Sequence, residues 1–249
     1  MSFSHTGFAL LNLYTFGSAN NFKRQVDCLS IKATKMRKLI LKLSVSLDGF
    51  AGTENGGIDW IFRTYDEEAT KWTLDVIRNA GAHLMGSRTF YDMRSYWPYS
   101  NEAFAAPMNE IPKIVASKKG LADFNAPNLT TNAQRDALAL MEQKGLRDTS
   151  IHSPGASWTE PTILTGDLAA EIAHLKQQPG KYILAHGGAG FARSLIKLNL
   201  VDEYQPLVHP IALGKGLPVF SALSKPMDLE LVNIMSFKSG AAAHIYQPK

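Results

Sequence analysis

Cysteine is nearly absent from this chain. Cys28 is the single cysteine in 249 residues, which excludes an internal disulfide framework and a zinc site built from several cysteines. The seven histidines are scattered, without a close pair at metal-ligand spacing. We therefore expect no metal site and a reducing, cytoplasmic environment.

Long hydrophobic runs are also missing. The apolar run at 8–16 is interrupted by Asn12, is too short to span a bilayer and has no basic region before it. Residues 1–35 are rich in Ser, Thr and Asn. They are expected to be a disordered leader or the product of a start placed ahead of a true start at Met36, with a weak organelle-targeting segment as the alternative.

Excess charge of one sign is confined to the first segment. The formal net charge is +4, and residues 1–35 hold four basic side chains against Asp27, which leaves +1 for the remainder. A nearly neutral body offers no electrostatic footprint for a phosphate backbone, so nucleic-acid binding is not expected.

Regular patterns begin at Arg37. Apolar side chains alternate from Leu39 to Leu47, which predicts a strand, and the pair Asp48-Gly49 ends it. Apolar residues then recur at helical spacing from 69 to 80, with acidic residues at 66–68 and Gly81 after the end.

The later elements predict an α/β fold. Strands are expected at 82–86, 112–116, 161–164 and 181–185, and helices at 87–94, 167–177 and 189–198. This alternation predicts a sheet covered on both faces. The final third has strands at 201–213, 227–237 and 242–247 without helices between them. The sheet should therefore be mixed and end in antiparallel strands.

A polar stretch at 123–158 does not fit a minimal domain. It contains a helix candidate from Ala133 to Met141 and the loop SIHSPGASW at 150–158. We interpret it as a surface insertion, with a lid as the alternative.

The stretch KYILAHGGAGFARSLI at 181–196 runs from a buried strand through glycines into a helix. The first amides of a helix have no intrahelical partner, and small residues let an anion approach them. Gly187, Gly188, Ala189 and Gly190 meet that need. The alternative is a tight turn without a ligand, and Arg193 breaks the dinucleotide pattern G-x-G-x-x-G.

Two further strand ends carry polar or small residues. Gly86, Ser87 and Thr89 lead into the helix at 87–94, where Ser87 or Thr89 could also serve only as a cap. Ser117 and Lys118 follow the strand at 112–116 and could hold a phosphate or form a solvated loop. Three such sites at strand ends indicate a ligand with several phosphates.

Together these motifs resemble the dihydrofolate-reductase-like superfamily, and most closely the reductase domain of the bifunctional riboflavin-biosynthesis deaminase-reductase. The resemblance covers 36–249 apart from the insertion. It rests on SLDGF at 46–50, Trp60, GSRTF at 86–90, KIVASK at 113–118, GGAGFARSLI at 187–196 and LVDEYQPLVHPIALGKGLPVF at 200–220. The H-x-E and P-C-x-x-C motifs of the zinc deaminase half do not occur.

The resemblance implies a three-layer α-β-α fold with a mixed, mostly parallel sheet, and NADPH lying across its strand ends. Gly86, Ser87 and Thr89 would meet the pyrophosphate side, Ser117 and Lys118 the adenosine phosphate, and 187–190 the phosphates at the helix start. Gly49, on the SLDG turn, would border the nicotinamide. The resemblance also implies a homodimer, for which the strands after Asp202 are the natural surface.

Asp48 is the candidate catalytic and substrate-binding carboxylate, because a carboxylate near the ring can orient the substrate or relay a proton. An ordinary Asp-Gly turn is the alternative. Trp60 could stack on a heterocyclic substrate, although an aromatic residue before a helix is more often part of the core.

Two positions depart from the riboflavin-pathway pattern. His186 stands where a glutamate is usual, and Thr70 stands where an arginine is usual. The expected activity is NADPH-dependent reduction of 5-amino-6-(5-phosphoribosylamino)uracil, or of a related heterocycle by a paralogue. Dihydrofolate reduction and a non-catalytic nucleotide-binding module are the alternatives.

Overall fold

The computed structural model describes residues 36–120, 131–148, 150 and 154–249. The expected leader at 1–35 and parts of the expected insertion lie outside the described residues. No helix within the described ranges is both long and apolar enough to cross a membrane.

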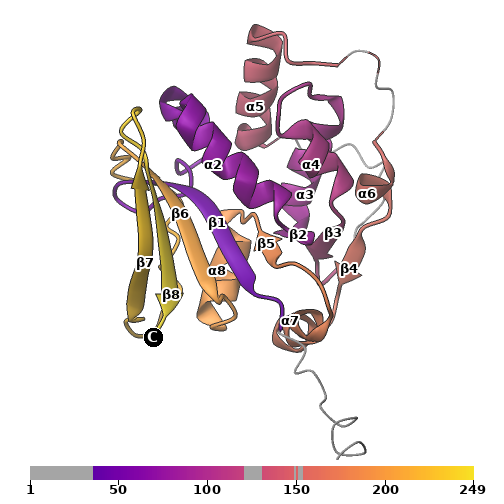
Figure 1. Ribbon diagram of the computed structural model, residues 1–249, viewed down its shortest axis with the longest axis vertical. Coiled ribbons are helices and arrows are strands. Elements are labelled where there is room, and N and C mark those ends of the chain that lie inside the picture. Colours follow the sequence, from indigo (N-terminus) through magenta and orange to yellow (C-terminus); the bar gives the residue numbers. More distant parts are fainter. Residues whose placement is uncertain (1–35, 121–130, 149, 151–153) are drawn as a thin grey trace, which may run out of the picture. The chain divides into compact units, whose positions relative to one another are not determined.

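Strands and helices alternate along the chain as the sequence predicts (Figure 1). The strands are β1 (Leu39–Ser46), β2 (Ala82–Gly86), β3 (Lys113–Ala116), β4 (Thr162–Leu164), β5 (Ile183–Ala185), β6 (Glu203–His209), β7 (Leu229–Ser236) and β8 (Ala242–Pro248). The helices are α2 (Glu67–Arg78), α3 (Ser87–Arg94), α4 (Ala105–Glu110), α5 (Asn132–Gln143), α6 (Ala156–Thr159), α7 (Leu168–Gln177) and α8 (Ala189–Lys197), with short 3₁₀ turns η1 (Asp59–Thr64) and η2 (Trp97–Tyr99).

In the described part of the chain, eight strands form one sheet in the order β4-β3-β2-β5-β1-β6-β8-β7. The first six strands in this spatial order, β4-β3-β2-β5-β1-β6, pair in parallel with their neighbours. Strand β8 is antiparallel to both β6 and β7. The predicted mixed sheet with antiparallel C-terminal strands is therefore confirmed.

Alternating side chains of β1 enter two separate cores. Leu39 and Leu41 pack with residues of α7 and α8 on one face, and Ile40 packs with residues of α2, α3 and α4 on the other. Figure 1 shows helices on both sides of the strands. A central parallel strand is buried on both faces, so the expected three-layer α-β-α arrangement is confirmed.

Local signals set the start of α2. Asp66 precedes the helix and accepts a hydrogen bond from the amide of Ala69 at 2.7 Å. The same carboxylate accepts from the amide of Ser239, in the turn between β7 and β8, at 2.7 Å. One side chain thus caps α2 and ties it to the C-terminal hairpin.

Strand β6 ends earlier than the sequence predicts. The expected strand at 201–213 stops at His209, and Pro210 follows. Proline has no amide to donate to a neighbouring strand, so pairing ends here and the chain enters a loop.

The described parts of the expected insertion contact the rest of the domain. Met141 of α5 is buried, and Trp158 of α6 is fully buried and donates its indole N–H to Oδ1 of Asn109 at 2.7 Å. Asp136 of α5 accepts from the amide of Ile58 at 2.8 Å. Met141 and Trp158 therefore add to the packed interior, and Asp136 attaches α5 to the loop that contains Ile58.

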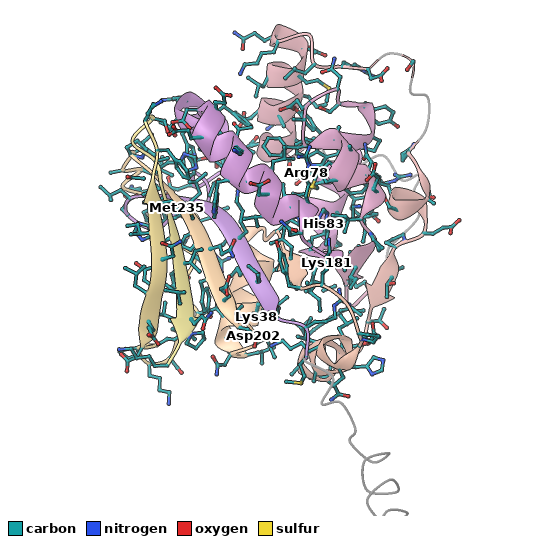
Figure 2. The ribbon with its side chains drawn as sticks, in the orientation of Figure 1. Lys38, Arg78, His83, Lys181, Asp202 and Met235 are labelled. Carbon is teal, nitrogen blue, oxygen red and sulfur yellow. The ribbon has the colours of Figure 1, made fainter. Side chains whose placement is uncertain are left out.

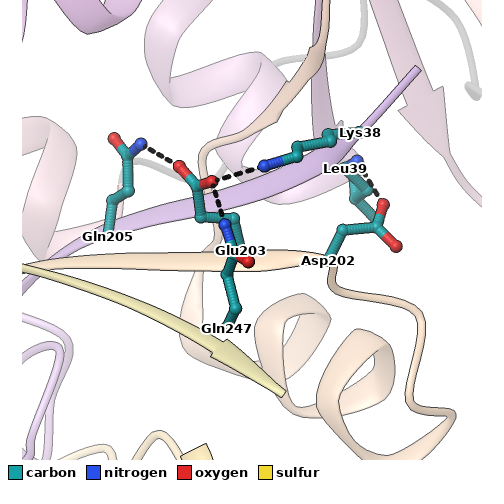
Figure 3. A network of polar contacts seen from close by, with 6 residues as sticks. All are labelled: Lys38, Leu39, Asp202, Glu203, Gln205 and Gln247. Carbon is teal, nitrogen blue, oxygen red and sulfur yellow. Dashed lines mark hydrogen bonds and ion pairs between the residues drawn. The ribbon is translucent and has the colours of Figure 1, made fainter. Parts of the chain in front are cut away.

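A polar network joins the starts of β1 and β6 (Figure 3). The buried carboxylate of Glu203 accepts from Lys38 at 3.0 Å, Gln205 at 2.7 Å and Gln247 at 3.1 Å. Burial raises the pKa of Glu203, but these three bonds outweigh that effect and the net pKa lies below its usual value. Asp202 accepts from the amide of Leu39 at 2.7 Å.

We predict that Glu203→Ala lowers the free energy of unfolding by about 2–4 kcal/mol, because it leaves the buried amide of Gln205 without its acceptor. Denaturant titration measures the change. Glu68→Ala, which removes an exposed ion pair with Lys238, is the control and should cost less than about 1 kcal/mol. Equal losses in the two variants would contradict a special role for the network.

Candidate functional site

The chain leaves β2 and β5 in opposite directions, although these strands are neighbours. Helix α3 leads from β2 to β3 on one face, and α8 leads from β5 to β6 on the other. Neighbouring parallel strands whose connections diverge leave a crevice beyond their carboxyl ends, where open α/β sheets bind ligands. Both helices begin close to the ends of these strands: α3 starts directly after β2, and α8 starts at Ala189, shortly after β5.

The glycine turn before α8 needs glycine for two reasons. Gly187 has φ of +84°, and a Cβ atom there would lie 2.5 Å from Cδ2 of Leu43. The Gly187-Gly188 peptide bond is cis. The backbone therefore passes close to β1 where a side chain would collide.

Two motifs that are far apart in the sequence meet at this turn. The amide of Gly188 donates to Oγ1 of Thr89 at 2.8 Å, and a Cβ atom on Gly86 would lie 3.2 Å from Cβ of Phe191. The starts of α3 and α8 thus lie side by side. The Gly188 amide is already used by Thr89, which leaves the amides of Ala189, Gly190 and Phe191 as the first-turn amides without an intrahelical partner.

The residues present fit a phosphate group at the start of α8. Gly190 is exposed, and a Cβ atom there would meet nothing closer than Nη2 of Arg193 at 4.0 Å. Free helix amides with open space before them suit an anion.

A second feature lies beyond the end of β3. Ser87, Ser117, Lys118 and Lys119 line a hollow of about 430 Å³ together with Tyr91, Ala116 and Gly120. The hydroxyl of Ser117 donates to the carbonyl of Gly120 at 2.6 Å and closes this turn. The hollow brings the second and third predicted motifs together, with two exposed ammonium groups at its rim.

Asp48 lies at the end of β1 and is exposed. Its carboxylate accepts from the hydroxyl of Ser46 at 2.6 Å and from the amides of Leu213 at 3.1 Å and Gly214 at 2.7 Å. The bond from Ser46, helped by those amides, holds the pKa of Asp48 below its usual value. A carboxylate held in this way stays ionised and is a poor proton donor.

Trp60 occupies a core position. It is 2% exposed, donates its indole N–H to the carbonyl of Gly57 at 3.3 Å, and stands edge-on to the ring of His209. A ring enclosed in this way presents no open face to a heterocycle, so the core interpretation fits better.

Sequence reasoning missed Lys42, which the structure places on the face of β1 beneath α2. Lys42 is 9% exposed, and its ammonium group lies 3.4 Å from the hydroxyl of Tyr65 and 6.0 Å from the ring centre of Trp72. No ion pair to Lys42 occurs among the described residues. The available signal was its place in a central strand, since a sheet covered on both faces must bury it.

Two histidines, His186 and His209, lie close enough to Lys42 to be affected by its charge. His186 lies edge-on to His83 with ring centres 4.6 Å apart, and His83 is buried near the C-terminal end of α2 (Figure 2). Burial, and then the charges of Lys42 and Lys113, lower the pKa of His186 to about 3. Burial and then Lys42 lower the pKa of His209 to about 4. All of these rings are therefore neutral at pH 7.

Thr70, the other departure from the family pattern, lies in the first turn of α2 and is partly buried. Among the residues described, no group of three or more His, Cys, Asp or Glu side chains is arranged to hold a metal ion.

The neutral histidines predict acid sensitivity. Their folded-state pKa values lie below the ordinary 6.5, so the unfolded state binds more protons between about 3 and 6.5. The free energy of unfolding should therefore be highest above pH 6.5. It should fall by on the order of a few kcal/mol as the pH drops toward 3. Denaturant titrations from pH 7 to pH 3.5 test this.

His209→Asn should flatten that acid limb, whereas the same change at exposed His174 should leave it unchanged. An acid limb of equal slope in both variants and the parent would contradict the assignment.

Comparisons with known proteins agree with the geometry. The Bacillus subtilis (strain 168) protein YyaP, which is uncharacterized, is 28% identical over 212 residues, 85% of this chain and 95% of its own length. The fold is similar to that of a protein provisionally assigned to riboflavin biosynthesis from Shewanella sp. PV-4, with a TM-score of 0.59 and 18% identity over 85% of this chain and 99% of that one.

A second similar structure is the diaminohydroxyphosphoribosylaminopyrimidine deaminase/5-amino-6-(5-phosphoribosylamino)uracil reductase of Thermotoga maritima. Its TM-score is 0.57 at 16% identity, covering 86% of this chain and 57% of that one. The model of the RibD C-terminal domain matches residues 37–243. Because this match spans most of the chain, the chain belongs to the RibD C-terminal domain family.

Proposed function

We propose that this protein is an NADPH-dependent reductase acting on 5-amino-6-(5-phosphoribosylamino)uracil or a related heterocycle. The observation that carries the proposal is the meeting of the α3 and α8 starts, joined by the bond from Gly188 to Thr89, beside a hollow rimmed by Lys118 and Lys119. Membership of the RibD C-terminal domain family supports it.

The residues divide the cofactor between two places. The first-turn amides of α8 at Ala189 and Gly190 would hold its pyrophosphate, with Thr89 fixing the turn. Lys118 would pair with the phosphate on the adenosine ribose, together with the Ser87 and Ser117 side of the hollow. The bound dinucleotide supplies the hydride.

Lys42 is the residue that suits the substrate side. An acceptor ring that receives a hydride gains negative charge. A buried ammonium group such as that of Lys42, which has no carboxylate partner in the described part of the chain, stabilises such charge strongly. The neutral rings of His186 and His209 near Lys42 do not compete with the substrate for its charge. Lys42 would therefore bind and orient the electron-accepting part of the heterocycle.

Titration of the full chain with NADPH and with NADH, followed by tryptophan fluorescence, tests the cofactor assignment. We expect micromolar binding of NADPH. Lys118→Ala should weaken NADPH binding by about ten-fold with little effect on NADH, because one charge-assisted contact is lost. Gly190→Val should weaken both nucleotides, and Lys144→Ala, at an exposed site on another loop, is the control.

Substrate-dependent oxidation of NADPH separates a reductase from a binding module. Lys42→Met should reduce turnover by about a hundred-fold while NADPH affinity stays within about two-fold. If folded protein binds neither nucleotide, the reductase proposal is wrong.

We also propose that two copies of the chain associate through β7. This edge strand exposes Leu231 (51%), Val232 (53%) and Ile234 (52%), and an exposed apolar edge is usually covered. Leu231 and Ile234 lie opposite Tyr246 and His244 of β8, so they continue an apolar hollow of about 200 Å³ on that sheet face.

Sedimentation or light scattering should therefore give a dimer for the parent chain. The double change Leu231→Glu and Ile234→Glu should give a folded monomer, whereas Leu198→Glu, at an exposed site after α8, should remain dimeric. A monomeric parent would contradict the proposal.

A further inference from the structure

Two loops at the carboxyl ends of β1 and β6 are joined along their length. The first loop comprises residues 46–52, and the second loop comprises residues 210–220. Backbone bonds connect them from Leu47 N to Ile211 O (2.8 Å), Ala51 N to Leu217 O (2.9 Å), Leu217 N to Gly52 O (2.9 Å) and Val219 N to Gly49 O (3.2 Å). They therefore form one unit beside the candidate site.

Asp48 is the side chain that joins these loops at their tips. Oδ1 accepts from Ser46 in the first loop and from the amide of Leu213 in the second, and Oδ2 accepts from the amide of Gly214. Both oxygens are thus engaged, one of them from both loops. Charge-assisted bonds to backbone amides are stronger than neutral ones, so this contact resists separation of the tips.

The close approach of the loops depends on glycine in the second loop. Gly214 has φ of +69°, and a Cβ atom on Gly216 would lie 2.3 Å from the carbonyl oxygen of Gly52. The backbone geometry that presents the two amides to Asp48 is therefore built into this loop.

The second loop is also attached to α8. Nη1 of Arg193 donates to the carbonyl of Pro218 at 2.9 Å, and α8 begins at the Gly187-Gly188 turn. A continuous series of contacts thus runs from Asp48 through the second loop and Arg193 to the helix whose start would hold the cofactor phosphate.

We propose that Asp48 is a positioning residue that holds the first and second loops together and, through Arg193, keeps the α8 turn in its nucleotide-binding geometry. This inference rests on the proposed function. It replaces a role in proton transfer, because Oδ1 already accepts hydrogen bonds from both loops and Oδ2 accepts one from the second loop.

Amide hydrogen exchange of the full chain, measured without any ligand, tests whether Asp48 holds the two loops together. Asp48→Ala should speed exchange by about ten-fold or more in both the 46–52 and 210–220 segments, and Asp48→Asn, which keeps one acceptor oxygen, by less. Asp148→Ala is the matched control, since Asp148 is partly exposed and accepts only from Ser150 among the described contacts. Faster exchange limited to the amides of Leu213 and Gly214 would contradict the claim that Asp48 holds the two loops together.

Nucleotide titration tests the connection to α8. We expect Asp48→Ala and Arg193→Ala each to raise the Kd for NADPH about ten-fold, and the double variant to raise it by clearly less than the product, because both act through the second loop. Asp48→Asn should recover part of the affinity. Additive effects, or an unchanged Kd in Asp48→Ala, would overturn the positioning role.

The two proposals fail in different ways. If the parent chain binds no nucleotide, the proposed function is wrong, and the exchange experiment still decides whether Asp48 joins the loops. If the parent binds NADPH and the Asp48 variants bind equally well, the function stands and the inference about Asp48 is wrong.

Discussion

The parallel pairing of β2 with β5 determines where the candidate nucleotide site of this protein lies. Because α3 and α8 leave these strands on opposite faces, their first turns meet at one edge of the sheet. The hydrogen bond from the amide of Gly188 to Thr89 joins the two first turns directly. This arrangement explains why three features are assigned to the candidate site: the glycines, the hollow beyond β3 and the loops beside β1.

Burial on both faces of the sheet explains the electrostatics of the site. Lys42 lies on a central strand that would ordinarily be wholly apolar, and it is buried beneath α2 with no carboxylate partner among the described residues. His186 directly follows β5. The histidines respond by remaining neutral, as their lowered pKa values require. Solvent screens the buried ammonium group of Lys42 little, and this is the reason why we propose it as the group that faces the electron-accepting part of the substrate.

Much of the fold was predictable because local patterns and tertiary packing agree. The helix expected at 87–94 and the strand expected at 82–86 coincide with α3 and β2. Asp48 and Trp60 were harder, since each had a structural alternative that sequence could not remove. The partners of Asp48 are Leu213 and Gly214, 165 and 166 residues further along the chain, and the ring of Trp60 packs against distant His209.

The sequence by itself determined the α/β class, the mixed sheet and the positions of the small residues at strand ends, because periodicity and glycine placement act over a few neighbouring residues. Tertiary structure alone decided that Gly188 bonds to Thr89, that Lys42 lies beside Tyr65 and Trp72, and that Asp48 joins two loops. These contacts depend on strand order and on the face that each helix covers, and no local pattern encodes either of them.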